Sequence, residues 1–170
     1  MLTLTKRIEK DFLGERELPN DVYYGIQTLR ATENFPITGL SIHSSLIKAM
    51  GIVKKSAALA NMEVGLLSEE IGHAIIKAAE EVIEGKWDSQ FIVDPIQGGA
   101  GTSINMNANE VIANRALEIK KKKKGNYKIV SPNTHVNMSQ STNDAFPTAI
   151  HISILKLINE LLKTMEAMKV

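Results

Sequence analysis

Apolar residues recur every three or four positions along much of this chain, and that spacing constrains the fold more than any other feature. The longest run contains Leu46, Ile47, Met50, Val53, Ala57, Ala60 and Val64. A second run contains Ile71, Ile75, Ala78 and Val82; Ser68 before it and Gly85 after it are typical of a helix start and a helix stop. Because this period is that of an amphipathic helix, the sequence predicts an all-α fold.

The remaining segments predict shorter elements. Residues 1–20 are charged and contain two helix breakers, which favours an extended arm or a hairpin. Short helices are expected from Tyr23 to Phe35 and from about Asn105 to Lys120. A short extended piece is expected over Tyr127–Val130. The prediction is therefore a helical domain with a few short strands.

The last segment has the spacing of a helix that packs among other helices. Its seam contains Ile154, Ile158, Leu161, Met165 and Met168, which alternate by four and three residues as in a coiled coil. Such a helix is normally buried, yet the sequence stops at Val170 without a capping residue. We therefore expect an N-terminal fragment, with an N-terminal domain over residues 1–140 and the truncated beginning of a central helical bundle over residues 141–170.

Composition narrows the class of protein. The net charge of +1 and the 23% of charged residues give no indication of nucleic-acid binding. The absence of cysteine excludes a disulfide scaffold and thiol catalysis, and it fits a reducing cytoplasm. The most apolar stretch, residues 149–162, is interrupted by polar side chains, so no membrane span is predicted. We expect a cytoplasmic protein that binds neither nucleic acid nor membranes.

Two polar loops of similar design are the candidate binding elements. The first loop, residues 98–103, reads GGAGTS, and the second loop, residues 140–144, reads QSTND; each leads into a predicted helix. Glycines let backbone N–H groups approach a ligand, helix N-termini favour negative charge, and hydroxyls donate to carboxylates. Two such loops that converge would bind a small dicarboxylate. The alternative is that these residues only cap helices, and residue chemistry alone favours it.

Three blocks of the sequence resemble the fumarase/aspartase superfamily. They are DVYYGIQTLRATENFPITG at residues 21–39, GGAGTSINMNANEVIANRA at residues 98–116 and HVNMSQSTNDAFPTAIHI at residues 135–152. They are similar to the N-terminal block and the first two signature regions of that superfamily, in the same order. The loops read GAGTS and QSTND as in aspartases, whereas fumarases typically read GSGT and QSSND. A fumarase-type hydro-lyase and a non-catalytic helical protein on a lyase scaffold remain the alternatives.

The resemblance implies an activity and roles for particular residues. Aspartases eliminate ammonia reversibly from L-aspartate to give fumarate, through an aci-carboxylate intermediate and without an organic cofactor; no metal ligands are expected. The matching motif assigns Thr102, Ser141 and Thr142 to the β-carboxylate of the substrate, and Asn143, with Thr102, to its amino group.

The resemblance also implies what these 170 residues do not contain. The general base of the family is a serine in a GSSxMPxKxN signature, which is expected beyond Val170. No catalytic base is therefore assigned within the chain. The family forms homotetramers whose active sites are shared between subunits, so the isolated chain is expected to be inactive.

The string SPNTHVN at residues 131–137 resembles a second anion site of fumarases, in which the motif reads SPNDHVN. Thr134 stands where that motif has an aspartate. We therefore favour a structural loop here, since residues of this kind are common in turns.

Overall fold

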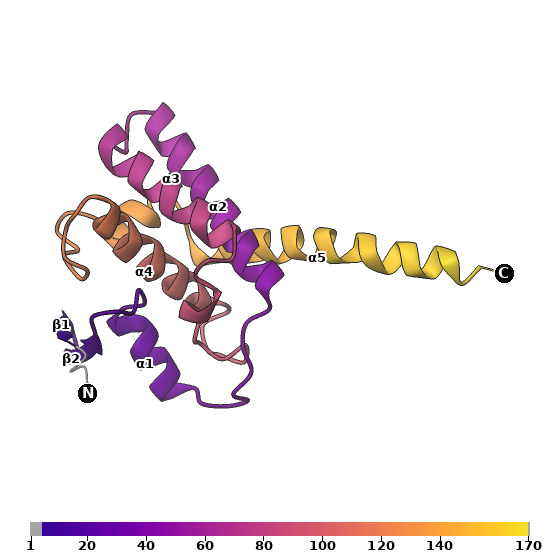
Figure 1. The fold of residues 1–170 in the computed structure, drawn as a ribbon, viewed down its shortest axis with the longest axis horizontal. Helices are drawn as coiled ribbons and strands as arrows, with labels where there is room; N and C mark the ends of the chain where they lie inside the picture. The colour runs from indigo at the N-terminus through magenta and orange to yellow at the C-terminus, as the bar shows by residue number, and fades with distance from the viewer. Residues whose placement is uncertain (1–4, 170) are drawn as a thin grey trace.

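A computed structural model describes residues 5–169, which form a helical body from which one long helix projects (Figure 1). The elements are β1 (Lys6–Asp11), β2 (Gly14–Pro19), α1 (Ile26–Asn34), α2 (Ser44–Glu63), α3 (Glu69–Ile83), α4 (Thr102–Ile119) and α5 (Thr142–Ala167). A short 3-10 turn spans Asp88–Gln90, and a π-helical turn spans Pro132–Val136. The predicted all-α fold with short strands is confirmed, and the strands form one antiparallel hairpin.

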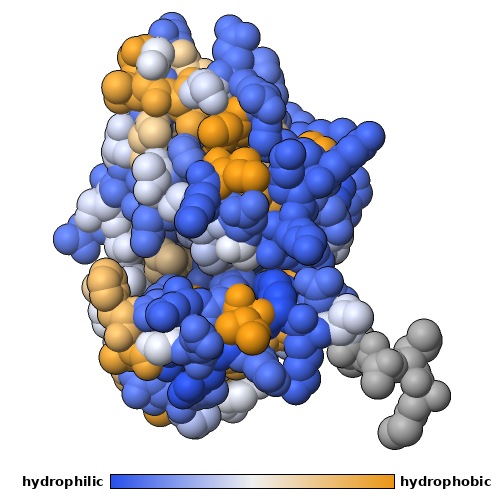
Figure 2. Space-filling model, turned by 90° about the vertical axis from the view of Figure 1, so that its left-hand side faces the viewer, coloured by the Kyte–Doolittle hydropathy of each residue, from blue (hydrophilic) through white to orange (hydrophobic). Residues whose placement is uncertain are grey.

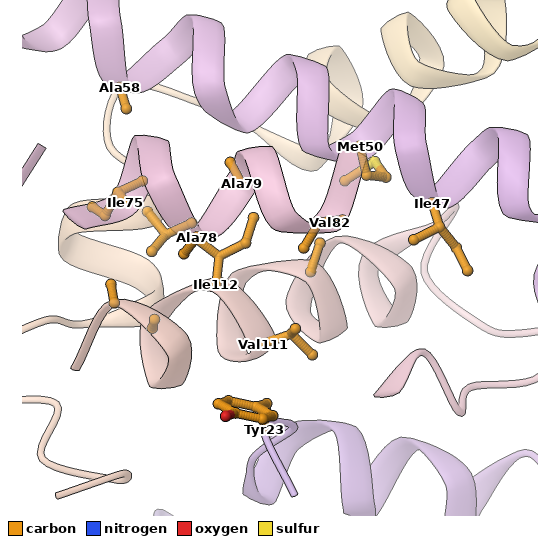
Figure 3. Close-up of a cluster of buried hydrophobic side chains, with 14 of the residues drawn as sticks. Tyr23, Ile47, Met50, Ala58, Ile75, Ala78, Ala79, Val82, Val111 and Ile112 are labelled. Atoms are coloured by element: carbon orange, nitrogen blue, oxygen red, sulfur yellow. The ribbon is translucent and has the colours of Figure 1, made fainter. Parts of the chain in front are cut away.

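The core lies where α2, α3 and α4 meet. Figure 3 shows side chains from all three helices in one apolar cluster, including Met50, Ile75, Val82 and Ile112, each of which is fully buried. A Cβ at Gly51 of α2 would lie 3.2 Å from the backbone oxygen of Ala79 in α3. Small residues thus let α2 and α3 approach closely, and α4 packs against the pair.

Two buried carboxylates attach the hairpin and α1 to this core. Glu110 of α4 accepts the backbone N–H groups of Gly25, Gln27 and Thr28 at 2.9–3.0 Å, together with the Thr28 hydroxyl. Glu9 of β1 accepts the N–H of the first residue of α1 at 3.0 Å. Because the first N–H groups of a helix have no partner within it, these carboxylates satisfy the start of α1 and fix its position.

The structure corrects the sequence-based prediction at three places. The buried face of α2 contains Lys54, Ala58 and Asn61, whereas Ala60 and Val64 of the predicted apolar run are exposed. The expected extended piece over 127–130 is a turn, because its backbone bonds are local ones. The fourth helix begins at 102, three residues earlier than predicted. Residues 1–4 of the predicted arm lie outside the described residues.

The surroundings of α5 differ along its length. Ala145, Ala149 and Ser153 are buried against the body. Beyond them the helix projects from the body (Figure 1), and its large apolar side chains are exposed: Ile154, Leu155, Leu157, Ile158, Leu161, Leu162, Met165 and Met168. The side of the molecule that faces away from the projecting part of α5 is mostly hydrophilic, with hydrophobic side chains in separate clusters (Figure 2). By length and composition alone α5 would suffice to cross a membrane, so the absence of a membrane span stays a prediction.

Candidate functional site

The first loop ends at a helix start that is built by glycine rather than by a hydroxyl cap. Gly101 occupies the N-cap of α4 with φ +92°, a conformation that L side chains rarely adopt. Gln97 accepts the N–H of Ile104 at 2.8 Å and so performs the capping function. Thr102 is exposed, and its hydroxyl donates to the carbonyl of Gly99 at 2.5 Å. A groove of about 530 Å³ opens beside Thr102, between α1 and α4.

Asp94 joins the segment just before the first loop to residues 38–39. Its carboxylate accepts the N–H groups of Thr38 and Gly39 at 2.6 and 2.9 Å, and the N–H of Ile96 at 2.8 Å. Burial by itself would raise the pKa of Asp94, but the hydrogen bonds from Thr38 and Ile96 outweigh that effect and lower it to about 2. Two segments that are far apart in the sequence are therefore held together beside the first loop.

The second loop ends in a capping box. Ser141 is the N-cap of α5; its hydroxyl oxygen accepts the N–H of Asn143 at 3.1 Å, and its own N–H donates to the carboxylate of Asp144 at 3.1 Å. The capping interpretation is thus correct for Ser141. Asn143 is exposed, and among residues 5–169 its side chain has no hydrogen-bond partner.

The two loops lie next to each other. Asn105, one turn after Thr102 on α4, donates from Nδ2 to the Thr142 hydroxyl oxygen at 3.0 Å. A Cβ on Gly101 would overlap the ring of Phe146 on α5, so the two helix starts are in contact. The Thr142 hydroxyl has no acceptor for its own proton within the part of the chain that the structure describes. Two positive helix ends and several neutral donors therefore meet at one place, which suits a carboxylate.

Sequence reasoning missed a polar network beneath the second loop. Asn137 Oδ1 accepts from Lys54 Nζ at 2.9 Å, from Asn105 Nδ2 at 3.1 Å and from Asn109 Nδ2 at 3.2 Å. Gln140 accepts from Lys54 as well, at 2.9 Å. A signal was available, because asparagine is unfavourable inside helices and α4 contains four buried ones.

Residues 131–135 form hydrogen bonds within their own segment. Ser131 Oγ accepts the N–H of Thr134 at 3.1 Å, and the N–H of Ser131 donates to His135 Nδ1 at 2.8 Å. Burial lowers the pKa of His135. These local bonds support a structural loop. Within residues 5–169, no group of three or more histidine, aspartate and glutamate side chains is arranged to hold a metal ion.

The sequence of the chain is similar to those of known lyases. The profile of a family described as "Lyase" matches residues 14–170. The chain is 74% identical over 163 residues to the aspartate ammonia-lyase of Bacillus sp., covering 96% of this chain and 35% of that protein. It is 73% identical over 162 residues to the aspartate ammonia-lyase of Bacillus subtilis (strain 168), covering 95% and 34%. The chain thus spans about a third of the length of these relatives.

A solved structure has the same fold. The fumarate lyase:delta crystallin from Brucella melitensis, in its native form, superposes with a TM-score of 0.93 at 48% sequence identity. The match covers 95% of this chain and 38% of that one. At this identity and overlap, the chain has the fold of the corresponding part of that protein.

Proposed function

Since this chain belongs to the lyase family, we propose that it forms the N-terminal part of an aspartate ammonia-lyase, which eliminates ammonia reversibly from L-aspartate to give fumarate. The observation that carries the proposal is the contact between the starts of α4 and α5 through Asn105 and Thr142, in a chain that is 74% identical to a relative of that name. The loop sequences GAGTS and QSTND support an aspartase rather than a fumarase.

The chemistry of the reaction explains why such a site would use neutral donors. Removal of a proton from the carbon beside the β-carboxylate places a second negative charge on that carboxylate. Hydroxyl and amide donors stabilise the charge without neutralising the group beforehand, and one donor of this kind typically contributes about 3–4 kcal/mol to the transition state. In this proposal Thr102, Ser141 and Thr142 receive the β-carboxylate, and Asn143 with Thr102 holds the amino group.

The Thr142 and Ser141 hydroxyls are suited to this role because each accepts a hydrogen bond from the protein. Thr142 accepts from Asn105, and Ser141 accepts from the N–H of Asn143. Each oxygen is thereby oriented while its own proton stays available to a ligand. Thr102 differs, because its hydroxyl donates to Gly99 and must turn to reach a substrate.

The rest of the site would come from outside these residues. We propose that the general base is the serine of the downstream signature and that the full-length enzyme is a homotetramer. The exposed apolar seam of α5 from Ile154 to Met168 supports assembly into a helical bundle. In this proposal residues 1–140 are the N-terminal domain and residues 141–170 begin the bundle, and the isolated chain is inactive.

The direct test is an assay of the full-length enzyme that contains this chain. Fumarate formation is followed by ultraviolet absorbance with L-aspartate and, separately, with L-malate. The proposal predicts turnover of L-aspartate and little or none of L-malate. Preference for L-malate would identify a hydro-lyase instead, and no turnover of either substrate would favour a non-catalytic protein on this scaffold.

A further inference from the structure

Lys54 is an unusual residue, because its amino group lies in the interior of the body. It lies in the middle of α2, its relative exposure is 0%, and it is the largest of the fully buried side chains. Within residues 5–169 it forms no ion pair with a carboxylate; its Nζ donates to the amide oxygens of Asn137 and Gln140, each at 2.9 Å. Burying a charge without a counter-charge is unfavourable, so stability alone does not account for a lysine here.

The Lys54 amino group holds the segment that leads into the second loop. Its two acceptors, Asn137 and Gln140, lie at either end of one turn of chain immediately before Ser141. That turn is fixed from within as well, since Asn137 Nδ2 donates to the carbonyl of Gln140 at 3.0 Å. Lys54 therefore connects both ends of the turn to α2 by hydrogen bonds.

A continuous chain of hydrogen bonds leads from Lys54 to Thr142. Asn137 Oδ1 accepts from Lys54 Nζ at 2.9 Å and from Asn105 Nδ2 at 3.1 Å, and Asn105 Nδ2 donates in turn to the Thr142 hydroxyl oxygen at 3.0 Å. These hydrogen bonds join α2, α4 and α5 at the point where the starts of α4 and α5 meet. The orientation of the Thr142 hydroxyl thus depends on the position of Asn137, which depends on Lys54.

The neighbouring residue Lys55 shows that a lysine in this part of α2 needs no such burial. Its side chain is 35% exposed and pairs with Glu80 of α3 at 2.7 Å. Burial lowers the pKa of Lys54 to about 7, and the negative charge of Asp144 offsets only part of that effect. Two adjacent lysines therefore have different surroundings, and only Lys54 is connected to the candidate site.

We propose that Lys54 is a positioning residue for the elimination reaction, which holds the second loop and the Thr142 hydroxyl in the geometry that stabilises the developing charge on the substrate's β-carboxylate. This inference rests on the function proposed above and adds a residue outside the loops to its site. Lys54 does not itself contact the substrate; it acts through Asn137, Asn105 and Thr142.

The test uses the full-length enzyme and the variant Lys54→Met, with Lys55→Met as the matched control. Removing an outer-shell side chain that orients a metal ligand typically costs about 10–100-fold in activity, and we take the same range for a side chain that orients a hydroxyl donor. We expect a loss of that size in kcat/KM for L-aspartate with Lys54→Met, mainly in kcat, because the oriented hydroxyl matters most in the transition state. Lys55→Met is expected to stay within about twofold of the wild type, as for a surface ion pair of low energy.

The decisive measurement is the same substitution in a Thr142→Ala background. If Lys54 acts through Thr142, Lys54→Met then lowers kcat/KM by less than about twofold further, because interacting residues are not additive. A loss of equal size in both backgrounds would show a general structural role and overturn the inference. Should Lys54→Met fail to fold, Asn137→Ala removes the middle of the same series of hydrogen bonds while retaining the lysine. This variant is expected to show the same dependence on Thr142.

The outcomes separate this inference from the proposed function. A loss with Thr142→Ala but wild-type kinetics with Lys54→Met and Asn137→Ala would overturn the role of Lys54 alone. Wild-type kinetics with Thr142→Ala would overturn the site itself, and the inference with it.

Discussion

The two polar loops each lead into the start of a helix but are held in place by different means. The first loop depends on backbone geometry: Gly99 and Gly101 have positive φ angles, and Gly98 and Gly101 leave no room for a side chain against Phe35 and Phe146. The second loop depends on side-chain hydrogen bonds, from the capping box of Ser141 and from the buried network below it. The two loops are therefore expected to differ in their sensitivity to substitution.

The difference also concerns the hydroxyls themselves. Thr142 is oriented by a donor from α4 and keeps its own proton free within the described residues, whereas Thr102 donates to Gly99 in its own loop. The second loop is thus preorganised for an anion, and the first loop needs a rotation of one side chain. Preorganised donors contribute more to catalysis, because they require no rearrangement as charge develops.

The largest effect is expected from Thr142→Ala in the full-length enzyme. Loss of a donor that acts in the transition state should lower kcat/KM for L-aspartate about 100-fold or more, measured by steady-state kinetics. Thr142→Ser is the control: it keeps the hydroxyl, imitates the fumarase sequence and should retain much of the activity. If Thr142→Ser were as impaired as Thr142→Ala, the hydroxyl would not be the essential group.

A smaller effect, on stability, is expected from Gly101→Ala in the first loop. The added methyl group would overlap the ring of Phe146, and overpacking of this kind costs about 1–3 kcal/mol. Gly65→Ala is the control, since Gly65 has φ +74° but no atom within 4 Å of the position of a Cβ. Chemical denaturation of both variants should show the larger loss for Gly101→Ala. Equal losses would mean that the positive φ alone matters and that the two helix starts are not tightly packed.

A smaller loss of stability is expected from Ser141→Ala, where the loss of an N-cap should lower the free energy of unfolding by about 1 kcal/mol. Thr142→Ala should cause less destabilisation, because Thr142 is not the cap. Ser141→Thr keeps a capping hydroxyl and should recover most of the stability. Unchanged unfolding of Ser141→Ala would contradict the capping box as a stabilising element of the second loop.

The local features of the fold could be predicted from the sequence. The apolar period of α3 and its stop at Gly85, which has φ +82°, were correct because they depend on neighbouring residues only. The capping function of Ser141 followed from residue chemistry in the same way. The closeness of the two loops was suggested by the resemblance to a family and not by the residues themselves.

Features that depend on distant parts of the chain were not predicted. Lys54 was missed because a lysine is normally exposed, and only the packing of α2 against the second loop explains why it is buried. Gln97 was missed as the cap of α4 because it is seven residues from Ile104, on the other side of the first loop. The carboxylate of Glu110 caps a helix more than eighty residues earlier, a distance at which local patterns give no information.

If both loops bind one substrate, Thr102→Ala should impair the reaction as a substitution in the second loop does. Thr102 is exposed and is not the N-cap of α4, so its removal should change the melting temperature little. We expect kcat/KM for L-aspartate to fall about 100-fold in the full-length enzyme, measured on the same samples as the melting temperature. Wild-type kinetics for Thr102→Ala, with or without a change in melting temperature, would show that the first loop does not contact the substrate.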